Sequence, residues 1–454
     1  MSLAHDPILA PPPAAPAPAA PNPAAPPLSA IGAERVHGLW KELFEARTQL
    51  DHRLVADLLP ALVGALRRLA APNGSYRVRL VEGLVRATGW APGAIEEGLA
   101  RFTRAYTENG LRAAIVRAVG SLETLDRRGQ RRAMAPRGTL LVTASTIPWA
   151  GIESLTWALL ARSTCLVRVS AGDPVTVPLF LEALAEEYPP LARTAAAVHW
   201  PSDDAEAHRA ALAYPEIVVV YGSDETVRAW HALAQERARP PRLIEHGHRM
   251  SVALIARGSL APGVADQVAD ALVREAALYD REGCLSPSIA YLEATGAIKP
   301  EDFAERCARA QQRWAERWPV RRMSDGHASF VHQARGACEM TGGQVWAPLD
   351  TDWTVALDRR TPPPAPVPGR FLWLHTFPDL EKLRARLLEW GDALSTIGTS
   401  GWKARDAELQ TIVGPTGATR LCSLATMQDP SLDRFHDGRS ELADLIRIRD
   451  WEPA

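Results

Sequence analysis

The sequence reads TLLVT over residues 139–143, TCLVRV over 164–169 and EIVVVY over 216–221, three short runs rich in β-branched and apolar residues. Strands are expected at 139–143, 164–169, 195–200 and 216–221, and helices between them at 152–161, 177–187 and 203–213. Strict alternation of strand and helix indicates βαβ crossovers, and hence a parallel sheet that binds ligands at the carboxyl ends of its strands. We therefore predict a Rossmann-type nucleotide-binding domain. No Gly-x-Gly-x-x-Gly loop is present, so the fold alone does not decide whether the sheet binds a dinucleotide or another ligand.

Regions of different character flank this segment. The N-terminus is almost entirely Ala and Pro, and the region after it repeats apolar residues at helical spacing, as in Val55, Leu58 and Leu62. Beyond the first sheet the alternation resumes, with strands expected at 251–256, 288–292 and 371–375 and helices at 264–278, 300–318 and 379–390. In chain order we expect a disordered tail (1–29), a helical region (30–134), the nucleotide-binding domain (135–250), a second α/β domain that carries the catalytic cysteine (251–425) and a C-terminal segment (426–454).

Composition excludes several classes of function. The 454 residues include 51 Lys or Arg and 53 Asp or Glu, for a net charge of -2. Because no basic stripe is present to neutralise phosphates, nucleic acid is not expected as a partner. The five cysteines are too irregular for a disulfide framework and no Cys or His pair has zinc spacing, so we expect no metal and a cytoplasmic location. Charges and a proline interrupt the most apolar stretch, so no membrane span is expected.

Cys284 is the candidate nucleophile. It lies in YDREGCLSPS, residues 279–288, between an expected helix and an expected strand. Gly283 beside it lets the backbone turn tightly and lets a substrate carbonyl approach. A free thiol ionises with a pKa of about 8.5, so a nearby charge or helix N-terminus would have to lower that pKa. Taken alone, any single cysteine is more often a small buried apolar residue, which is what we expect of the other four.

Seven short motifs follow one another along the chain. They are Thr146-Ile147-Pro148-Trp149, Val167-Arg168-Val169-Ser170 with Asp173-Pro174, Val220-Tyr221-Gly222-Ser223, Ile244-Glu245-His246-Gly247, Glu282-Gly283-Cys284-Leu285-Ser286-Pro287, Thr419-Arg420 and His436-Asp437-Gly438-Arg439. In this order they resemble the aldehyde dehydrogenase superfamily, and specifically its acyl-CoA reductase branch, the family of the bioluminescence fatty-acid reductase subunit. The resemblance implies an aldehyde dehydrogenase-like α/β fold, with a Rossmann-type cofactor domain, a second α/β catalytic domain and a helical N-terminal region.

The resemblance also implies catalytic roles. Cys284 would take the acyl group as a thioester, which hydride from a nicotinamide then reduces. Oxyanion donors would be the backbone N–H of Cys284 and the side chain at Thr146, where the superfamily has Asn. Glu245 falls on the general base of hydrolytic aldehyde dehydrogenases, and here it would either deprotonate Cys284 or be structural. His246 and His248 flank the same turn and are alternative proton carriers.

Cofactor residues follow from the same resemblance. Gly222 and Ser223 match the loop that approaches the pyrophosphate, and Arg168 matches a Lys that binds the adenosine ribose, with Ser170 in the same motif. The acidic residue of NAD-preferring members falls on Ala171. A 2′-phosphate would therefore meet Arg168 and no carboxylate, which favours NADPH over NADH.

Together these residues predict an NADPH-dependent acyl-CoA reductase that forms an aldehyde through an acyl-Cys284 intermediate. Two alternatives stay open: an NAD(P)-dependent aldehyde dehydrogenase that uses Glu245 and water, and a scaffold that keeps the fold without the chemistry. The expected substrate is an acyl-CoA or another acyl thioester. As in related enzymes, we also expect an acyl-donating protein partner and assembly into a homo-oligomer.

Overall fold

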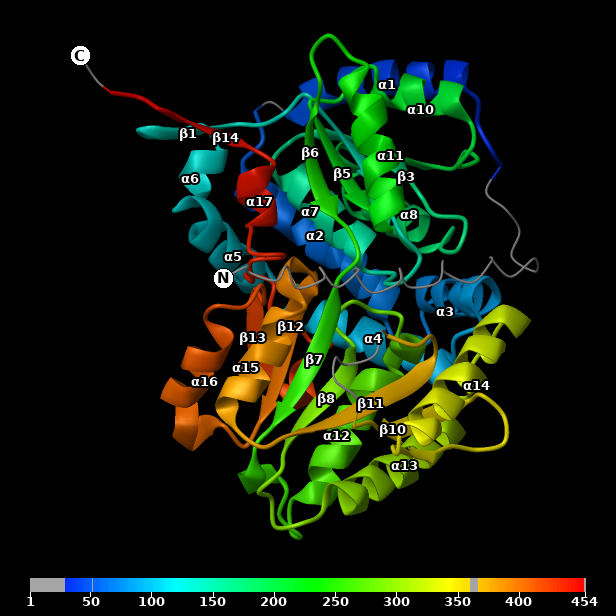
Figure 1. Ribbon diagram of the computed structural model, residues 1–454. Coiled ribbons are helices and arrows are strands. Elements are labelled where there is room, and N and C mark those ends of the chain that lie inside the picture. Colours follow the sequence, from blue (N-terminus) through cyan, green and yellow to red (C-terminus); the bar gives the residue numbers. More distant parts are fainter. Residues whose placement is uncertain (1–28, 51, 360–365, 453–454) are drawn as a thin grey trace, which may run out of the picture.

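The computed structural model describes residues 29–50, 52–359 and 366–452. Nearly all of the predicted disordered tail lies outside the described residues. The described chain forms two mainly parallel sheets, one above the other, each covered by helices (Figure 1). The α/β alternation predicted from the sequence is confirmed.

The first sheet has the strand order β4-β3-β2-β5-β6, and all its strands are parallel. The strands are β2 (Gly138–Val142), β3 (Thr164–Arg168), β4 (Ala195–Val198), β5 (Ile217–Tyr221) and β6 (Arg242–His246). The connecting helices are α7 (Ala150–Leu160), α8 (Thr176–Glu187), α9 (Pro189–Ala192), α10 (Ala205–Leu212) and α11 (Asp224–Gln235). From β2 the chain moves outward through β3 and β4 and then returns to β5 on the other side. Open α/β sheets bind ligands at such a reversal, at the carboxyl ends of the strands.

The N-terminal helices cover the first sheet. They are α1 (Ala33–Arg47), α2 (Val55–Ala70), α3 (Ser75–Thr88), α4 (Pro92–Ala105), α5 (Glu108–Val119) and α6 (Leu122–Leu125). On one face α1 packs with α10, and Trp40 Nε1 donates a 3.1 Å hydrogen bond to the Ala211 carbonyl. On the other face α2 packs with α7 and α8. Both faces are therefore buried, which explains why the strands read as continuous apolar runs.

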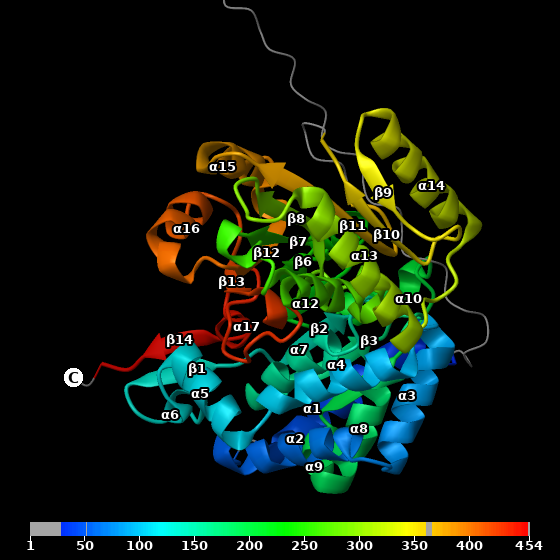
Figure 2. The ribbon, with the colours of Figure 1, turned by 90° about the horizontal axis from the view of Figure 1, so that it is seen from below.

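The second sheet has the order β13-β12-β7-β8-β11-β10-β9, with only β9 antiparallel to its neighbour among the described strands. The strands are β7 (Met250–Ile255), β8 (Pro287–Glu293), β9 (Gln344–Trp346), β10 (Trp353–Leu357), β11 (Arg370–Phe377), β12 (Leu394–Ser400) and β13 (Arg420–Ser423). Its helices are α12 (Ala265–Ala277), α13 (Pro300–Arg317), α14 (Asp325–Met340), α15 (Leu380–Leu388) and α16 (Asp406–Val413). Helices α12 and α13 share a core with the N-terminal helices, whereas α14, α15 and α16 pack on the opposite face (Figure 2).

The two sheets meet end to end. Only residues 247–249 separate the end of β6 from the start of β7, and the chain runs almost straight from one strand into the other (Figure 1). The carboxyl edge of the first sheet therefore faces the amino edge of the second. Cys284 lies at that amino edge, just before β8. The fold thus brings the predicted ligand-binding edge and the predicted nucleophile together.

The C-terminal segment returns to the first sheet's side of the molecule. After β13, the chain forms the short helix α17 (Glu441–Asp444) and the strand β14 (Arg447–Asp450). This strand pairs antiparallel with β1 (Arg131–Met134), with Arg131 opposite Asp450. The segment lies beside α5, α6 and β1 (Figure 1). Residues 430–440 consequently pass the junction between the two sheets.

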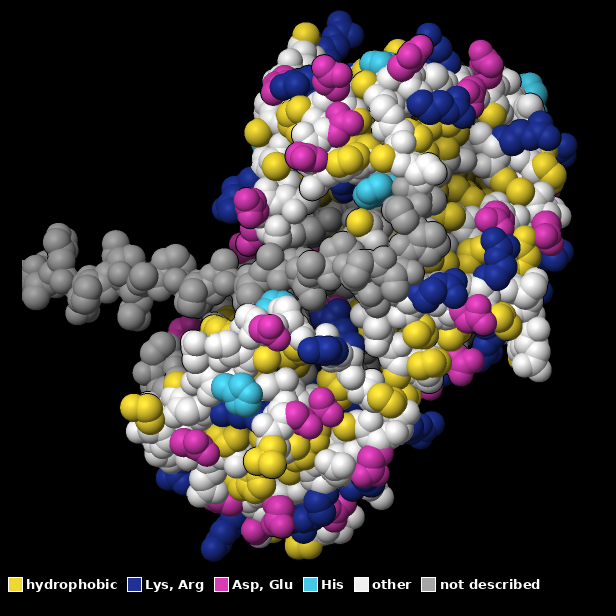
Figure 3. Space-filling model, turned by 90° about the vertical axis from the view of Figure 1, so that its right-hand side faces the viewer, with side chains coloured by type: hydrophobic (Ala, Val, Ile, Leu, Met, Phe, Trp, Pro, Cys, Tyr) yellow, Lys and Arg dark blue, Asp and Glu magenta, His cyan; other side chains and the backbone are white. Residues whose placement is uncertain are grey.

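The surface carries both signs of charge. On the face shown in Figure 3, basic and acidic side chains are intermingled over both lobes. Among the described helices, none combines the length and the apolar character that a membrane crossing requires.

Candidate active site

A cavity of about 640 Å³ lies where the two sheets meet. Cavities of this size commonly bind cofactors and small substrates. The structure places six of the seven predicted site residues around it: Thr146, Arg168, Ser170, Gly222, Ser223 and Cys284. Loops from the first sheet, the second sheet, helix α4 and the C-terminal segment all contribute to its wall. The seventh predicted residue, Glu245, does not line it.

A turn of left-handed residues immediately precedes Cys284 and places it at this cavity. The helix expected to reach residue 278 ends one residue earlier, and Tyr279, Asp280 and Arg281 follow with φ of 55°, 50° and 64°. Such a conformation costs roughly 1–2 kcal/mol per non-glycine residue, so surrounding contacts must hold it. Arg370 Nε donates a 2.8 Å hydrogen bond to Asp280 Oδ1, and both side chains are buried. The turn is therefore fixed by the strand next to β8.

The Cys284 thiol is only partly accessible. Its backbone carbonyl accepts a 2.6 Å hydrogen bond from Ser251 Oγ, which ties the nucleophile's loop to the start of β7. Burial, followed by the charge of Asp437, raises the pKa of the Cys284 thiol to about 11, against the opposing charges of Arg434 and Arg249. This is the opposite of the lowered pKa that we expected. The protonated thiol is therefore the main form at neutral pH, and a nucleophilic role for Cys284 would require a base.

Glu245 lies on the far side of strand β6 from this thiol. Its carboxylate accepts a 2.9 Å hydrogen bond from His231 Nδ1 of helix α11 and lines a separate polar cavity of about 440 Å³. The next residue, His246, lines the cavity of Cys284 instead. Consecutive side chains of a strand point to opposite faces, so only one of these two neighbours can face the nucleophile. The sequence motif contained both and did not distinguish them.

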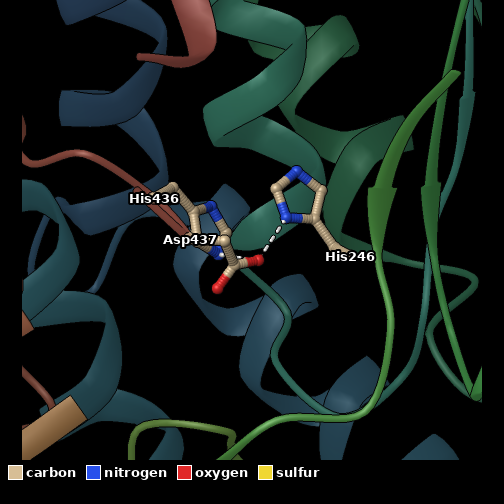
Figure 4. Close-up of side chains that lie close together, drawn as sticks. All are labelled: His246, His436 and Asp437. Atoms are coloured by element: carbon tan, nitrogen blue, oxygen red, sulfur yellow. Dashed lines mark hydrogen bonds and ion pairs between the residues drawn. The ribbon is translucent and has the colours of Figure 1, made fainter. Parts of the chain in front are cut away.

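His246 is enclosed on several sides. Its ring stacks on those of both Tyr221 and His436, with centroids 4.4 and 4.3 Å away. Its Nδ1 lies 2.9 Å from Asp437 Oδ2, while its buried Nε2 has no hydrogen-bond partner among the described residues. Figure 4 shows Asp437 reaching from the C-terminal segment toward the ring. His248, the other proposed proton carrier, also borders the cavity but is exposed.

The charges define the tautomer of His246. Burial opposes ionisation of Asp437, but the hydrogen bond from His246 and the nearby His436 and Arg249 lower the pKa of Asp437 to about 2. Asp437 is therefore an anion that only accepts hydrogen bonds, so His246 Nδ1 must carry a proton. Burial also lowers the pKa of His246, which makes the neutral ring the main form at pH 7. The Nε2 of a neutral ring protonated at Nδ1 is an acceptor.

His246, His436 and Asp437 each offer a ligand-type atom, and these atoms lie within 4.8 Å of one another. Existing hydrogen bonds already occupy several of their polar atoms. Asp437 Oδ2 accepts from His246 Nδ1, and His436 Nδ1 lies 2.6 Å from Glu441 Oε1. The arrangement therefore fits an acid-base group, and we assign no metal to it.

The predicted cofactor residues form one side of the cavity. Arg168 Nη2 donates to the Trp200 carbonyl at 3.0 Å, while its buried Nε has no hydrogen-bond partner among the described residues. Ser223 caps helix α11 by accepting a 3.2 Å hydrogen bond from the Thr226 N–H. A Cβ at Gly222 would lie 2.9 Å from the Thr226 side chain. Only glycine therefore fits this close to the start of helix α11. The unpaired donor of Arg168 and the helix N-terminus beside Gly222 suit an anionic dinucleotide.

Another side of the cavity is apolar. Phe102 of helix α4 stacks on Trp149, with ring centroids 5.7 Å apart. Trp149 ends the loop that begins with Thr146, and both residues border the cavity. A Cβ added to Gly283 would lie 3.6 Å from Ile147 of the same loop. The loop of Thr146 therefore packs against the residue before Cys284. Helix α4 of the N-terminal region thus contributes directly to the site, a contribution that the sequence left unassigned.

Comparison with solved structures identifies the fold. A putative aldehyde dehydrogenase, PutA, from Anabaena variabilis superposes with a TM-score of 0.70 at 14% identity, covering 92% of this chain and 93% of that one. Betaine aldehyde dehydrogenase from Staphylococcus aureus gives a TM-score of 0.70 at 11% identity, covering 93% and 88%. The chain therefore has the aldehyde dehydrogenase fold, as predicted.

The family is narrower than the fold. The acyl-CoA reductase (LuxC) family matches residues 55–448, and the chain belongs to this family. Long-chain acyl-protein thioester reductases are similar: that of Vibrio harveyi is 21% identical over 224 residues, or 48% of this chain and 45% of the relative. The corresponding protein of Aliivibrio fischeri is 25% identical over 185 residues, or 38% and 36%. The matches span less than two thirds of the length of these relatives.

Proposed function

We propose that this protein reduces an acyl thioester to an aldehyde through an acyl-Cys284 intermediate, with NADPH as the hydride donor. The observation that carries the proposal is the shared cavity. One cavity is bordered by the thiol, by the residues that match a cofactor site and by an apolar wall. Family membership supports this reaction class, and the names of the relatives describe reductases of acyl-protein thioesters.

The chain's own groups suit acyl transfer to sulfur. Exchange of one thioester for another changes bond energy little, so catalysis requires mainly positioning and oxyanion stabilisation. The N–H of Cys284 and the hydroxyl of Thr146 are the proposed oxyanion donors. A Thr hydroxyl is shorter than an Asn amide, so the backbone donor would contribute the larger share. Phe102 and Trp149 would hold the acyl chain against the apolar wall.

The cofactor would lie along the edge of the first sheet. Bound NADPH would supply the hydride that converts the acyl group to the aldehyde. Gly222 and Ser223 would bind the pyrophosphate at the N-terminus of helix α11. Arg168 would place its unpaired donor near the ribose, and Ser170 lies in the same wall. With Ala171 in place of a carboxylate, we propose a preference for the 2′-phosphate of NADPH.

The alternative reaction, oxidation of an aldehyde by water, has less support. Its proposed base, Glu245, borders a different cavity and is paired with His231. The donor of the acyl group is proposed to be acyl-CoA or an acylated protein, in keeping with the names of the relatives. Assembly into a homo-oligomer stays a prediction.

The test is direct. Incubation of the protein with a series of acyl-CoA chain lengths, followed by intact-mass and peptide mass spectrometry, is expected to show one acyl group on Cys284. Addition of NADPH should then release the aldehyde and remove the label. No acyl group on Cys284 with any chain length, or hydrolysis to the free acid instead of aldehyde release, would contradict the proposal.

A further inference from the structure

We infer that His246 and Asp437 form the proton-transfer pair of this site: His246 Nε2 accepts the proton of the Cys284 thiol and returns it to the departing thiol, while Asp437 orients the ring. This inference deepens the proposed function and rests on it for the identity of the departing thiol. His246 is thus assigned as a catalytic residue and Asp437 as a positioning residue.

The first support is the placement of the two residues. His246 ends β6 and Cys284 precedes β8, and both border the same cavity. The start of β7 links them, because Ser251 lies opposite Pro287 in the sheet and its hydroxyl binds the Cys284 carbonyl. The junction between the two sheets therefore sets the position of the base relative to the nucleophile.

The second support is the need for a base and the presence of a free acceptor. With a pKa of about 11, Cys284 would be ionised on the order of one part in ten thousand at pH 7. His246 Nε2 is buried, unpartnered among the described residues and, by the tautomer argued above, an acceptor. A buried acceptor without a partner is unfavourable unless a ligand or a reacting group uses it.

The third support is the way the C-terminal segment presents Asp437. The backbone at Asp437 and Gly438 is left-handed, with φ of 49° and 79°, and His436 and Arg439 bridge the base of this tight turn. Asp-Gly is a residue pair that favours such a turn, because both of its central residues have positive φ. The turn places the carboxylate against His246 Nδ1, in the manner of the Asp that orients a catalytic His.

Asp437 also connects the site with the polar cavity on the other side of β6. It borders both that cavity and the cavity of Cys284. Several charged and titratable groups surround the pair. Tyr221 and His436 stack on the ring, and Glu441 pairs with His436. Arg249 and Arg439 lie near the carboxylate, and the Glu153–Arg434 ion pair lies along the cavity wall.

The proposed step balances without an oxidant or reductant. The S–H bond of Cys284 breaks and its proton moves to His246 Nε2. A bond forms between Cys284 Sγ and the acyl carbon, the bond from that carbon to the departing sulfur breaks, and His246 gives its proton to that sulfur. His246 is then neutral again, and the chain carries a thioester.

The experiment measures the reactivity of Cys284 without substrate or cofactor. The full-length protein is alkylated with iodoacetamide from pH 5 to 10, and the rate at Cys284 is followed by peptide mass spectrometry. In the wild type we expect the rate to rise as His246 becomes neutral and then to level off up to about pH 9. In His246→Gln we expect at least a tenfold lower rate at pH 7 and a steady tenfold rise per pH unit.

Two further variants separate orientation from folding. Asp437→Asn should lower the rate at pH 7 but retain the plateau, because the base remains while the amide no longer fixes its orientation or the proton on Nδ1. His231→Gln is the matched control, since His231 also pairs with a carboxylate, but with that of Glu245, which borders the other cavity. It should alkylate like the wild type.

An unchanged rate and pH profile in His246→Gln would overturn the inference. So would a wild-type rate that falls on treatment with EDTA and returns with Zn²⁺, because the three side chains would then be metal ligands. Acylation by acyl-CoA, measured in parallel, tests the proposed function separately. If acylation fails while the alkylation profiles differ as expected, the proton-transfer pair stands and the proposed substrate is wrong.

Discussion

Arg370 Nε donates a 2.8 Å hydrogen bond to Asp280 Oδ1, four residues before Cys284, and the two side chains are 2% and 3% exposed. The second Arg370 donor, Nη2, binds the Trp318 carbonyl at 2.7 Å. The contact joins the start of β11 to the left-handed turn that precedes Cys284, the proposed nucleophile. The position of the sulfur thus depends on a buried ion pair contributed by two segments about 90 residues apart.

Arg370→Met should destabilise the protein by about 3 kcal/mol or more, because removal of one partner leaves the carboxylate of Asp280 buried without its main counter-charge. Urea unfolding followed by tryptophan fluorescence measures this loss. Arg384→Met is the control, since Arg384 pairs with Glu381 on the exposed face of α15 and should cost less than about 1 kcal/mol. Equal effects of the two substitutions would refute the role given to the buried pair.

Cys284→Ala should abolish acyl labelling and lower NADPH-dependent aldehyde formation by at least about a thousandfold, since no other group provides the thioester. Cys422→Ala is the comparison, because Cys422 is also partly accessible but does not border the cavity. It should label and turn over like the wild type. Labelling that persists in the first variant would place the nucleophile elsewhere.

Gly222→Ala should raise the Kd of NADPH at least about tenfold, because the added Cβ would lie 2.9 Å from Thr226 and displace the N-terminus of α11. Fluorescence titration with NADPH measures the change. Gly336→Ala on α14 has open space around the new Cβ and should leave binding unchanged while it raises helix stability slightly. Undiminished affinity in the first variant would argue against a pyrophosphate at this loop.

Arg168→Gln should weaken NADPH more than NADH, by roughly tenfold in the ratio of the two Kd values, because the guanidinium is the proposed partner of the 2′-phosphate. Titrations of wild type and variant with both nucleotides give the ratio directly. A proportional loss for both nucleotides would restrict Arg168 to a ribose or structural role. A wild type that prefers NADH would contradict the proposed cofactor preference.

Acid should destabilise the protein partly through His436. Burial, followed by the charge of Arg434, lowers the pKa of His436 to about 4. The unfolded chain therefore takes up a proton near pH 6.5, whereas the folded chain does so only near pH 4. Neutral His436 therefore contributes about 3 kcal/mol to the free energy of unfolding. This contribution is fully present above pH 6.5 and is lost as the pH falls through 4.

Urea midpoints at pH 7 and pH 4.5 test this sign. The urea midpoint of His436→Gln should fall less between pH 7 and pH 4.5 than that of the wild type. His332→Gln, at an exposed position of α14, is the control, and its midpoint should fall as much as that of the wild type. A wild type that becomes more stable on acidification would show that the assigned direction is wrong.

Local pattern was most informative where strands are buried on both faces. The run of Val218, Val219 and Val220 has side chains in both cores, so its continuous apolar character predicted a parallel strand. Strands β12 and β13 were not predicted, because LSTIGTS and RLCS mix small and polar residues that resemble loops. Their strand form depends on tertiary pairing: β12 lies beside β7, which is far away in sequence, and β13 lies beside β12.

The order of residues along the chain was sufficient to predict the alternating α/β architecture, because alternation of strand and helix is a local signal. Cys284 and the loops after β2, β3 and β5 were singled out by resemblance to a family, and their roles stay predictions. The choice between Glu245 and His246 needed three dimensions. Side-chain direction in a strand alternates with every residue, so it depends on how β6 is set in its sheet. The partner of His246, Asp437, lies 191 residues away, and only the return of the C-terminal segment to the junction of the sheets brings its charge to the ring.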